Sequence, residues 1–196
     1  MAKCFDYVSL CRLPMTFLRI LMLYRSGLGV GISATAFMRH NISTTIVEID
    51  PAVYNAARTF FGLPEPTNIF LEDAREWAAK KRMKIDAGHN ENLFDIVVHD
   101  CFSGGGVPEH IYTMEFWSDL KAAMRPDGLL VVVRPISSSI DYALIPHEQN
   151  YAGIFKSESS KLIVNTLERS FGHCRAFHDM SDTFTHTEFI NMVCIF

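Results

Sequence analysis

The stretch "GLGVGISATAFMRHNISTTIVEIDPAV", residues 27–53, decides the fold. Three glycines alternate at its start, an apolar helical segment follows, and a β-branched run leads to Asp50 and Pro51. Asp50 as an N-cap and Pro51 at the first helical position predict a helix over 51–61 that ends at Gly62. A glycine loop, a helix, a strand and a second helix in this order are typical of a parallel sheet covered by helices.

The same alternation of strands and helices continues along the chain. The hydrophobic periodicity predicts strands over 19–24, 44–49, 68–71, 94–100 and 129–134, and helices over 33–40, 51–61, 74–83 and 113–124. The polar stretch 80–92 is expected to be a surface loop, and Pro126-Asp127-Gly128 a turn. A helix over 158–171 precedes two strands, 173–178 and 190–196, that a polar loop joins as a hairpin.

These elements predict an α/β fold with a seven-stranded, mostly parallel sheet and a C-terminal antiparallel hairpin. A closing hairpin of this kind is typical of the Rossmann-like class I methyltransferase fold, whereas dinucleotide-binding sheets continue with helical crossovers. The chain has 196 residues, of which 48% are hydrophobic, and this length fits one domain with a single core.

Composition excludes several classes of partner. The formal net charge of −4 and scattered basic residues predict no nucleic-acid partner. The apolar stretch 15–24 contains Arg19 and is far shorter than the roughly 20 residues of a membrane span. No histidine or cysteine spacing typical of a metal site occurs. The sequence has five cysteines and no C-x-x-C pair: Cys4, Cys11, Cys101, Cys174 and Cys194. This pattern indicates a reducing compartment, so we expect a cytoplasmic protein.

Candidate binding residues begin with the glycine loop. Gly27, Gly29 and Gly31 stand at the carboxyl end of the first strand, where a loop without side chains lets a ligand touch the backbone. Glu48 follows 21 residues after Gly27 at the tip of the neighbouring strand, where a carboxylate can accept hydrogen bonds from two ribose hydroxyls. The nicotinamide fingerprint G-x-G-x-x-G fails at Ile32, so a sulfonium nucleoside is favoured over NAD.

Two further acids follow strands of the predicted sheet. Asp73 can receive the exocyclic amine of an adenine, or cap the helix that begins at Ala74, or do both. Asp100 ends the fourth strand before a glycine-rich loop, where it can accept a proton from an amine or hold a cationic substrate. A purely structural capping role for Asp100 is the alternative. His99 should point to the opposite face and pack there or lie at the surface.

Five segments together resemble the spermidine synthase-like (polyamine aminopropyltransferase) family of the class I methyltransferase fold: "GLGVG", "IVEIDP", "LEDAREW", "VVHDCFSGGGVPEHIYTMEFW" and "RPDGLLVVV". The resemblance covers about residues 27–196. It implies that the glycine loop, Glu48, Asp73 and Ala74 hold S-adenosylmethionine or its decarboxylated form. It also implies that Asp100 contacts this co-substrate and is the general base that deprotonates an attacking amine, with no metal involved.

The chain departs from the family at named positions. Aminopropyltransferases carry acids where this chain has Val30 and Ser103, and two positive charges of a diamine require such anions. Residues 1–26 form a lead-in that is shorter than the family's amino-terminal segment, which suggests a truncated or differently spliced start before the domain at 27–196.

Three functions therefore stay open. They are aminopropyl transfer to an amine, S-adenosylmethionine-dependent methyl transfer to a small-molecule or protein amine, and nucleoside binding without catalysis. The resemblance is also compatible with a homodimer.

Overall fold

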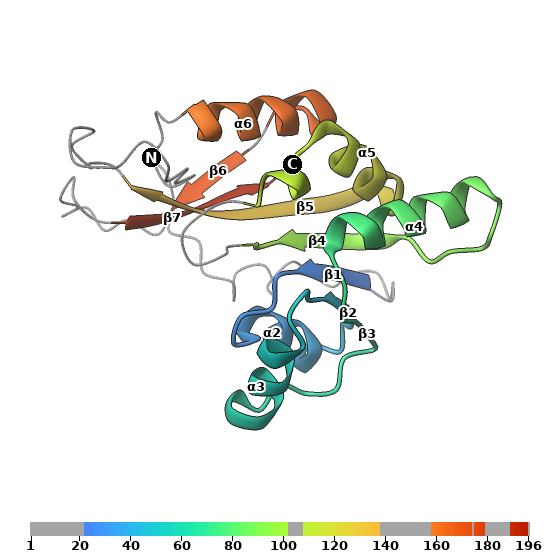
Figure 1. Cartoon of the computed structure of the whole chain (residues 1–196), viewed down its shortest axis with the longest axis vertical. Helices are drawn as coiled ribbons and strands as arrows, with labels where there is room; N and C mark the ends of the chain where they lie inside the picture. Colours follow the sequence, from blue (N-terminus) through green and yellow to red (C-terminus); the bar gives the residue numbers. More distant parts are fainter. Residues whose placement is uncertain (1–21, 102–107, 138–157, 174, 179–188, 196) are drawn as a thin grey trace.

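The computed structural model describes residues 22–101, 108–137, 158–173, 175–178 and 189–195 (Figure 1). The elements follow in the order β1 (Met22–Ser26), α2 (Ile32–Arg39), β2 (Ser43–Val47), α3 (Pro51–Phe61), β3 (Asn68–Phe70), α4 (Ala74–Asp86), β4 (Phe94–His99), the 3₁₀ helix η1 (Glu109–Ile111), α5 (Met114–Ala122), β5 (Met124–Ser137), α6 (Glu158–Phe171), β6 (Arg175–His178) and β7 (Phe189–Ile195).

The strands form one sheet in the order β3-β2-β1-β4-β5-β7-β6. Strands β1 to β5 pair in parallel, and β7 runs antiparallel between β5 and β6. The strand order reverses between β1 and β4, so that the loops after these two strands lie next to each other at the carboxyl edge. The connection between β6 and β7 falls outside the described residues, so the expected hairpin loop stays a prediction.

The sheet is covered on both faces because its central strands are apolar on both. Val97, Leu130 and Val132 pack in a cluster with residues of α4, α5 and α6. Val98 and Val131 lie in a second cluster, which includes Phe37 of α2. Strand alternation places these two sets on opposite faces. Figure 1 shows α4, α5 and α6 together along one side of the sheet, while α2 and α3 lie near β1, β2 and β3.

Local sequence signals explain where the helices near the sheet edge begin. The Asp50 carboxylate accepts a hydrogen bond from the Ala52 N–H at 2.8 Å, and the helix ends at Gly62 in the left-handed conformation. The predicted cap of α3 is therefore confirmed. Thr113 caps α5 through a hydrogen bond from the Phe116 N–H, so this helix begins one residue later than expected.

Two predicted loops were wrong. α4 continues to Asp86 instead of ending at Met83. In its last turn Ile85 packs against the hydrophobic core, and Arg82 and Asp86 form an ion pair at 2.7 Å on the exposed side. The predicted turn at 126–128 lies inside β5, where the pairing with β4 shifts register between Phe94 and Ile96.

The first strand also extends beyond its expected end. Arg25 and Ser26 belong to β1 and pair with β2 and β4, while residues 19–21 lie outside the described part. Within the described residues, no helix has the length and apolar character that crossing a membrane requires.

Candidate functional site

The predicted site residues follow four neighbouring parallel strands. Gly27 follows β1, Glu48 follows β2, Asp73 stands just beyond β3, and Asp100 follows β4. Because the carboxyl ends of parallel strands meet at one edge of the sheet, residues that are 21 to 73 positions apart come together there.

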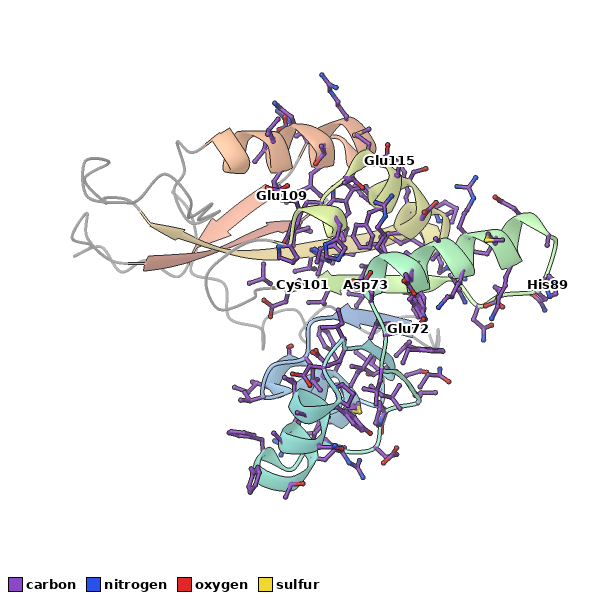
Figure 2. All side chains as sticks on the ribbon, in the orientation of Figure 1. Glu72, Asp73, His89, Cys101, Glu109 and Glu115 are labelled. Carbon is purple, nitrogen blue, oxygen red and sulfur yellow. The ribbon has the colours of Figure 1, made fainter. Side chains whose placement is uncertain are left out.

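A cavity of about 490 Å³ lies at this edge. Its volume is in the range of small-molecule sites, which is about 300–1,000 Å³. Figure 2 labels two of its lining residues, Asp73 at the start of α4 and Cys101 after the end of β4. Its lining includes all the predicted site residues except Gly31: Gly27, Gly29, Glu48, Asp73, Ala74 and Asp100, together with Leu28, Val47, Ile49, Val53, Glu72, Cys101, Pro108, His110 and Ile111.

The three loop glycines all have positive φ, but their surroundings differ. A Cβ at Gly27 would lie 2.1 Å from the backbone oxygen of Asp100, and one at Gly31 would lie 2.8 Å from the Leu63 side chain. A Cβ at Gly29 would meet nothing within 4 Å. Gly27 is therefore required for close packing against backbone, the Leu63 side chain could shift away from a Cβ at Gly31, and Gly29 leaves backbone open beside the cavity.

Glu48 joins two loops of the site. Its Oε2 accepts a hydrogen bond from the Leu28 N–H at 2.8 Å, and its Oε1 accepts one from the Asp50 N–H at 2.9 Å. Only 6% of the residue is exposed, yet it lines the cavity. Each oxygen of an ionised carboxylate can accept about two hydrogen bonds, so both oxygens keep acceptor capacity for a ligand.

Asp73 caps α4 and also contacts a histidine from another loop. Its Oδ1 accepts hydrogen bonds from the N–H groups of Arg75 at 2.8 Å and Glu76 at 3.3 Å. Its Oδ2 lies 2.8 Å from Nε2 of His110. Burial acts to raise the pKa of Asp73, but the hydrogen bonds from His110, Arg75 and Glu76 outweigh it and hold the pKa below its usual value.

Asp100 lies half-buried in the cavity wall, directly after β4. The adjoining residues 102–107, with Ser103, are outside the described part of the chain. Val30 is described and 41% exposed, so the loop presents an apolar side chain at a position where the family resemblance implies an acid. His99 is fully buried on the face of β4 that packs against Tyr112 and Trp117, which settles its predicted role as packing.

His110 is a polar residue of the cavity wall that was not among the predicted site residues. It stands 37 residues after Asp73, in a short 3₁₀ helix inside a segment that resembles the family, but no role was assigned to it. Its neighbours Pro108 and Glu109 gave no signal either, because only the folded sheet edge brings this loop to α4. Among the described residues, no group of three or more histidine, cysteine or acidic side chains could hold a metal ion.

Comparison with known protein families gives one match to a family model. The spermine/spermidine synthase domain matches residues 27–169. An N-terminal histidine N-methyltransferase of Emericella nidulans is 34% identical over 167 residues, which is 85% of this chain and 26% of the relative. A polyamine aminopropyltransferase of Vibrio vulnificus is 33% identical over 109 residues, which is 54% of this chain and 34% of the relative. The chain thus spans about a quarter to a third of these relatives.

Solved structures share the fold at low sequence identity. A probable spermidine synthase from Corynebacterium glutamicum has a TM-score of 0.63 at 20% identity over 89% of this chain and 55% of its own. Human methyltransferase-like protein 13, in complex with SAH, has a TM-score of 0.62 at 17% identity over 90% of this chain and 72% of its own. The fold is therefore that of class I S-adenosylmethionine-dependent methyltransferases.

Proposed function

We propose that this chain, which belongs to the spermine/spermidine synthase family, is a transferase. It binds S-adenosylmethionine and transfers the methyl group of this co-substrate to a protein amine. The nitrogen of an N-terminal histidine is the first acceptor to test, since the relative that aligns over 85% of the chain is named for that substrate.

The cavity supports the binding of a sulfonium nucleoside. Glu48 offers one further acceptor position on each oxygen to the two ribose hydroxyls, and its bonds to the two backbone N–H groups fix its orientation. Asp73 also lines the cavity, where it would receive the amine of the base, with Ala74 beside it. Gly29 leaves room for the ligand at the loop. Gly31 does not line the cavity, and it would support the shape of the loop through its packing against Leu63.

The bound nucleoside would supply an electrophilic methyl group next to a sulfonium. Asp100 would then be the residue that orients the attacking amine and accepts its proton, because it reaches the cavity from the end of β4. In this transfer a nitrogen–carbon bond forms, the carbon–sulfur bond breaks with its electrons going to sulfur, and the amine proton passes to the Asp100 carboxylate.

Val30 is the observation that favours methyl transfer over aminopropyl transfer. A diamine brings two positive charges into the cleft, and each needs a compensating anion. Val30 is apolar and 41% exposed where the family's aminopropyltransferases carry an acid. A single neutral amine needs no such anion, so a methyl acceptor fits this loop better.

Two assays with the full chain separate the candidates. Methyl transfer is measured from S-adenosylmethionine to a peptide that begins with histidine, and the same peptide with an acetylated amino terminus is the matched control. Aminopropyl transfer is measured from decarboxylated S-adenosylmethionine to putrescine.

We expect turnover with the free peptide alone. Turnover with putrescine alone would establish aminopropyl transfer, the second candidate, which the Vibrio vulnificus relative supports. If isothermal titration shows that the chain binds methylthioadenosine while neither assay gives turnover, the chain is a nucleoside-binding homologue without catalysis.

A further inference from the structure

His110 reaches the cavity from a different part of the chain than Asp73. It belongs to η1, in the loop that leads from β4 to α5, whereas Asp73 begins α4. The His110 Nε2 and the Asp73 Oδ2 are 2.8 Å apart, and the two side chains are 50% and 23% exposed. Both line the cavity, so this contact forms part of its wall and not only of the surface.

The contacts of Asp73 leave it little free capacity. An ionised carboxylate accepts about four hydrogen bonds, two at each oxygen. Oδ1 already accepts two, from the backbone of Arg75 and Glu76, and Oδ2 accepts one from His110. Counting the contacts that the described residues make, one acceptor position is left for a ligand, and it lies on the oxygen that His110 contacts.

The direction of the His110 hydrogen bond follows from its partner. The pKa of Asp73 is held below its usual value, so the carboxylate is ionised at neutral pH and can only accept. His110 must therefore donate through Nε2. This donation fixes Oδ2 in place and removes one of the two directions from which a ligand could approach it.

The backbone of His110 is held independently of its side chain. Arg75 donates hydrogen bonds to the carbonyl oxygen of His110 at 3.2 Å and to Oγ1 of Thr113 at 2.6 Å. The loop before α5 is thereby fastened to the start of α4. Truncation of the His110 side chain should remove the donor to Asp73 while the loop stays in position.

We propose that His110 is a positioning residue that acts through Asp73 to make the cavity select a 6-aminopurine over a 6-oxopurine. This inference rests on the proposed function, because it takes the ligand to be a purine nucleoside. A single remaining acceptor on a fixed, ionised oxygen can accept an N–H from an exocyclic amine, and it repels the carbonyl oxygen that replaces this amine in hypoxanthine. Without His110, Oδ2 is less fixed and the discrimination should decline.

The test compares methylthioadenosine with methylthioinosine by isothermal titration of the full chain. The second ligand has a carbonyl oxygen in place of the 6-amine and a proton on the neighbouring N1. We expect His110→Ala to lower the affinity for methylthioadenosine by about two- to tenfold, the range of a half-exposed hydrogen bond to a charged group. The affinity for methylthioinosine should stay the same or rise, so the ratio of the two affinities falls.

Two further variants make the result specific. His110→Gln keeps an N–H donor on a side chain of similar length and should restore most of the parent ratio. His89→Ala removes an exposed histidine that Figure 2 shows at the opposite end of α4 from Asp73, and it should behave as the parent. Thermal unfolding of each variant checks that the fold is kept.

The outcomes that would overturn the inference differ from those that overturn the proposed function. If His110→Ala leaves the ratio unchanged, or weakens both ligands equally, His110 supports the wall without selecting the base. If the parent binds neither nucleoside, the proposed function itself fails. A ratio that falls in His110→Ala and returns in His110→Gln is the result we expect.

Discussion

Glu48 connects two loops through hydrogen bonds from the Leu28 and Asp50 backbone N–H groups. Glu48→Gln keeps the shape but offers one accepting oxygen and an amide group that can only donate. We expect a loss of about 1–3 kcal/mol in the free energy of unfolding, measured by urea denaturation, because one buried N–H loses its acceptor.

The matched control for Glu48 is Glu65→Gln. Glu65 is 69% exposed in an ion pair with Arg58, and the loss there should stay within about 1 kcal/mol. Equal effects of the two variants would show that Glu48 contributes nothing special to the loops.

Asp100 is the residue whose loss should affect turnover more than binding. Asp100→Asn retains size and hydrogen-bonding capacity while removing basicity. We expect turnover to fall by about 10²–10⁴-fold, the usual contribution of a general base, while the affinity for nucleoside changes only a few-fold.

Single-turnover kinetics with the acceptor that the parent uses would measure this loss. Asp127→Asn, at an exposed carboxylate in the first part of β5, is the control and should keep parent activity. A turnover in Asp100→Asn equal to that of the control would leave Asp100 as a loop residue without a chemical role.

At the scale of the elements, the glycine loop between β1 and α2 allows a sharp comparison. Gly27 has φ of +80° and Gly29 has φ of +54°, so alanine is strained at both. At Gly27 the new Cβ would also meet the Asp100 carbonyl oxygen, whereas at Gly29 it would meet open space. We expect Gly27→Ala to lower the free energy of unfolding by about 1–3 kcal/mol more than Gly29→Ala does.

At Gly29, a substitution should affect ligand binding more than stability. Gly29→Val places a branched side chain beside the cavity, so the variant should lose affinity for methylthioadenosine more than stability. Normal binding by a folded Gly29→Val variant would mean that this part of the loop is only a turn.

The strands and helices around the cavity could be predicted because their signals are local. The β-branched run of β2 and the Asp50-Pro51 start of α3 each depend on neighbouring residues alone. The end of α4 could not be predicted in this way. The charged residues around its last turn resemble a loop in sequence, but Ile85 packs against the core there and Arg82 forms an ion pair with Asp86.

The site was predictable to the extent that it follows strand ends. Glu48, Asp73 and Asp100, which line the cavity, could be proposed from the sequence because each follows a β-branched or apolar run. The contact between Asp73 and His110 was not found, since 37 residues separate the partners and only the parallel sheet brings them together. The hydrogen bond from the Leu28 N–H to Glu48 was missed for the same reason, because 20 residues separate the two partners.

At the scale of the whole molecule, His99 links stability to pH. It is completely buried against the rings of Tyr112, Phe116 and Trp117, and this burial lowers its pKa from 6.5 to about 3. Between about pH 6.5 and pH 3, His99 binds a proton in the unfolded chain but stays neutral in the folded chain. The stability that is present above pH 6.5 is therefore lost as the pH falls toward 3.

The expected slope is up to about 1.4 kcal/mol per pH unit in this window. His99→Phe keeps an aromatic ring but cannot titrate, so its free energy of unfolding should depend less on pH between about pH 4 and pH 6. Urea unfolding across this range measures the difference. His89→Phe, at an exposed histidine, should keep the parent slope, and a parent slope in His99→Phe would contradict the assignment.

The sequence contains two tryptophans, Trp77 and Trp117, and both lie in the cluster that α4, α5 and α6 form on one face of the sheet. Their intrinsic fluorescence is therefore an optical reporter of that layer alone. The layer of α2 and α3 has Tyr54 packed against its core cluster but no indole. Circular dichroism follows the helices of both layers, so coincidence of its unfolding curve with that of the tryptophan emission would show that the two faces melt as one cooperative unit.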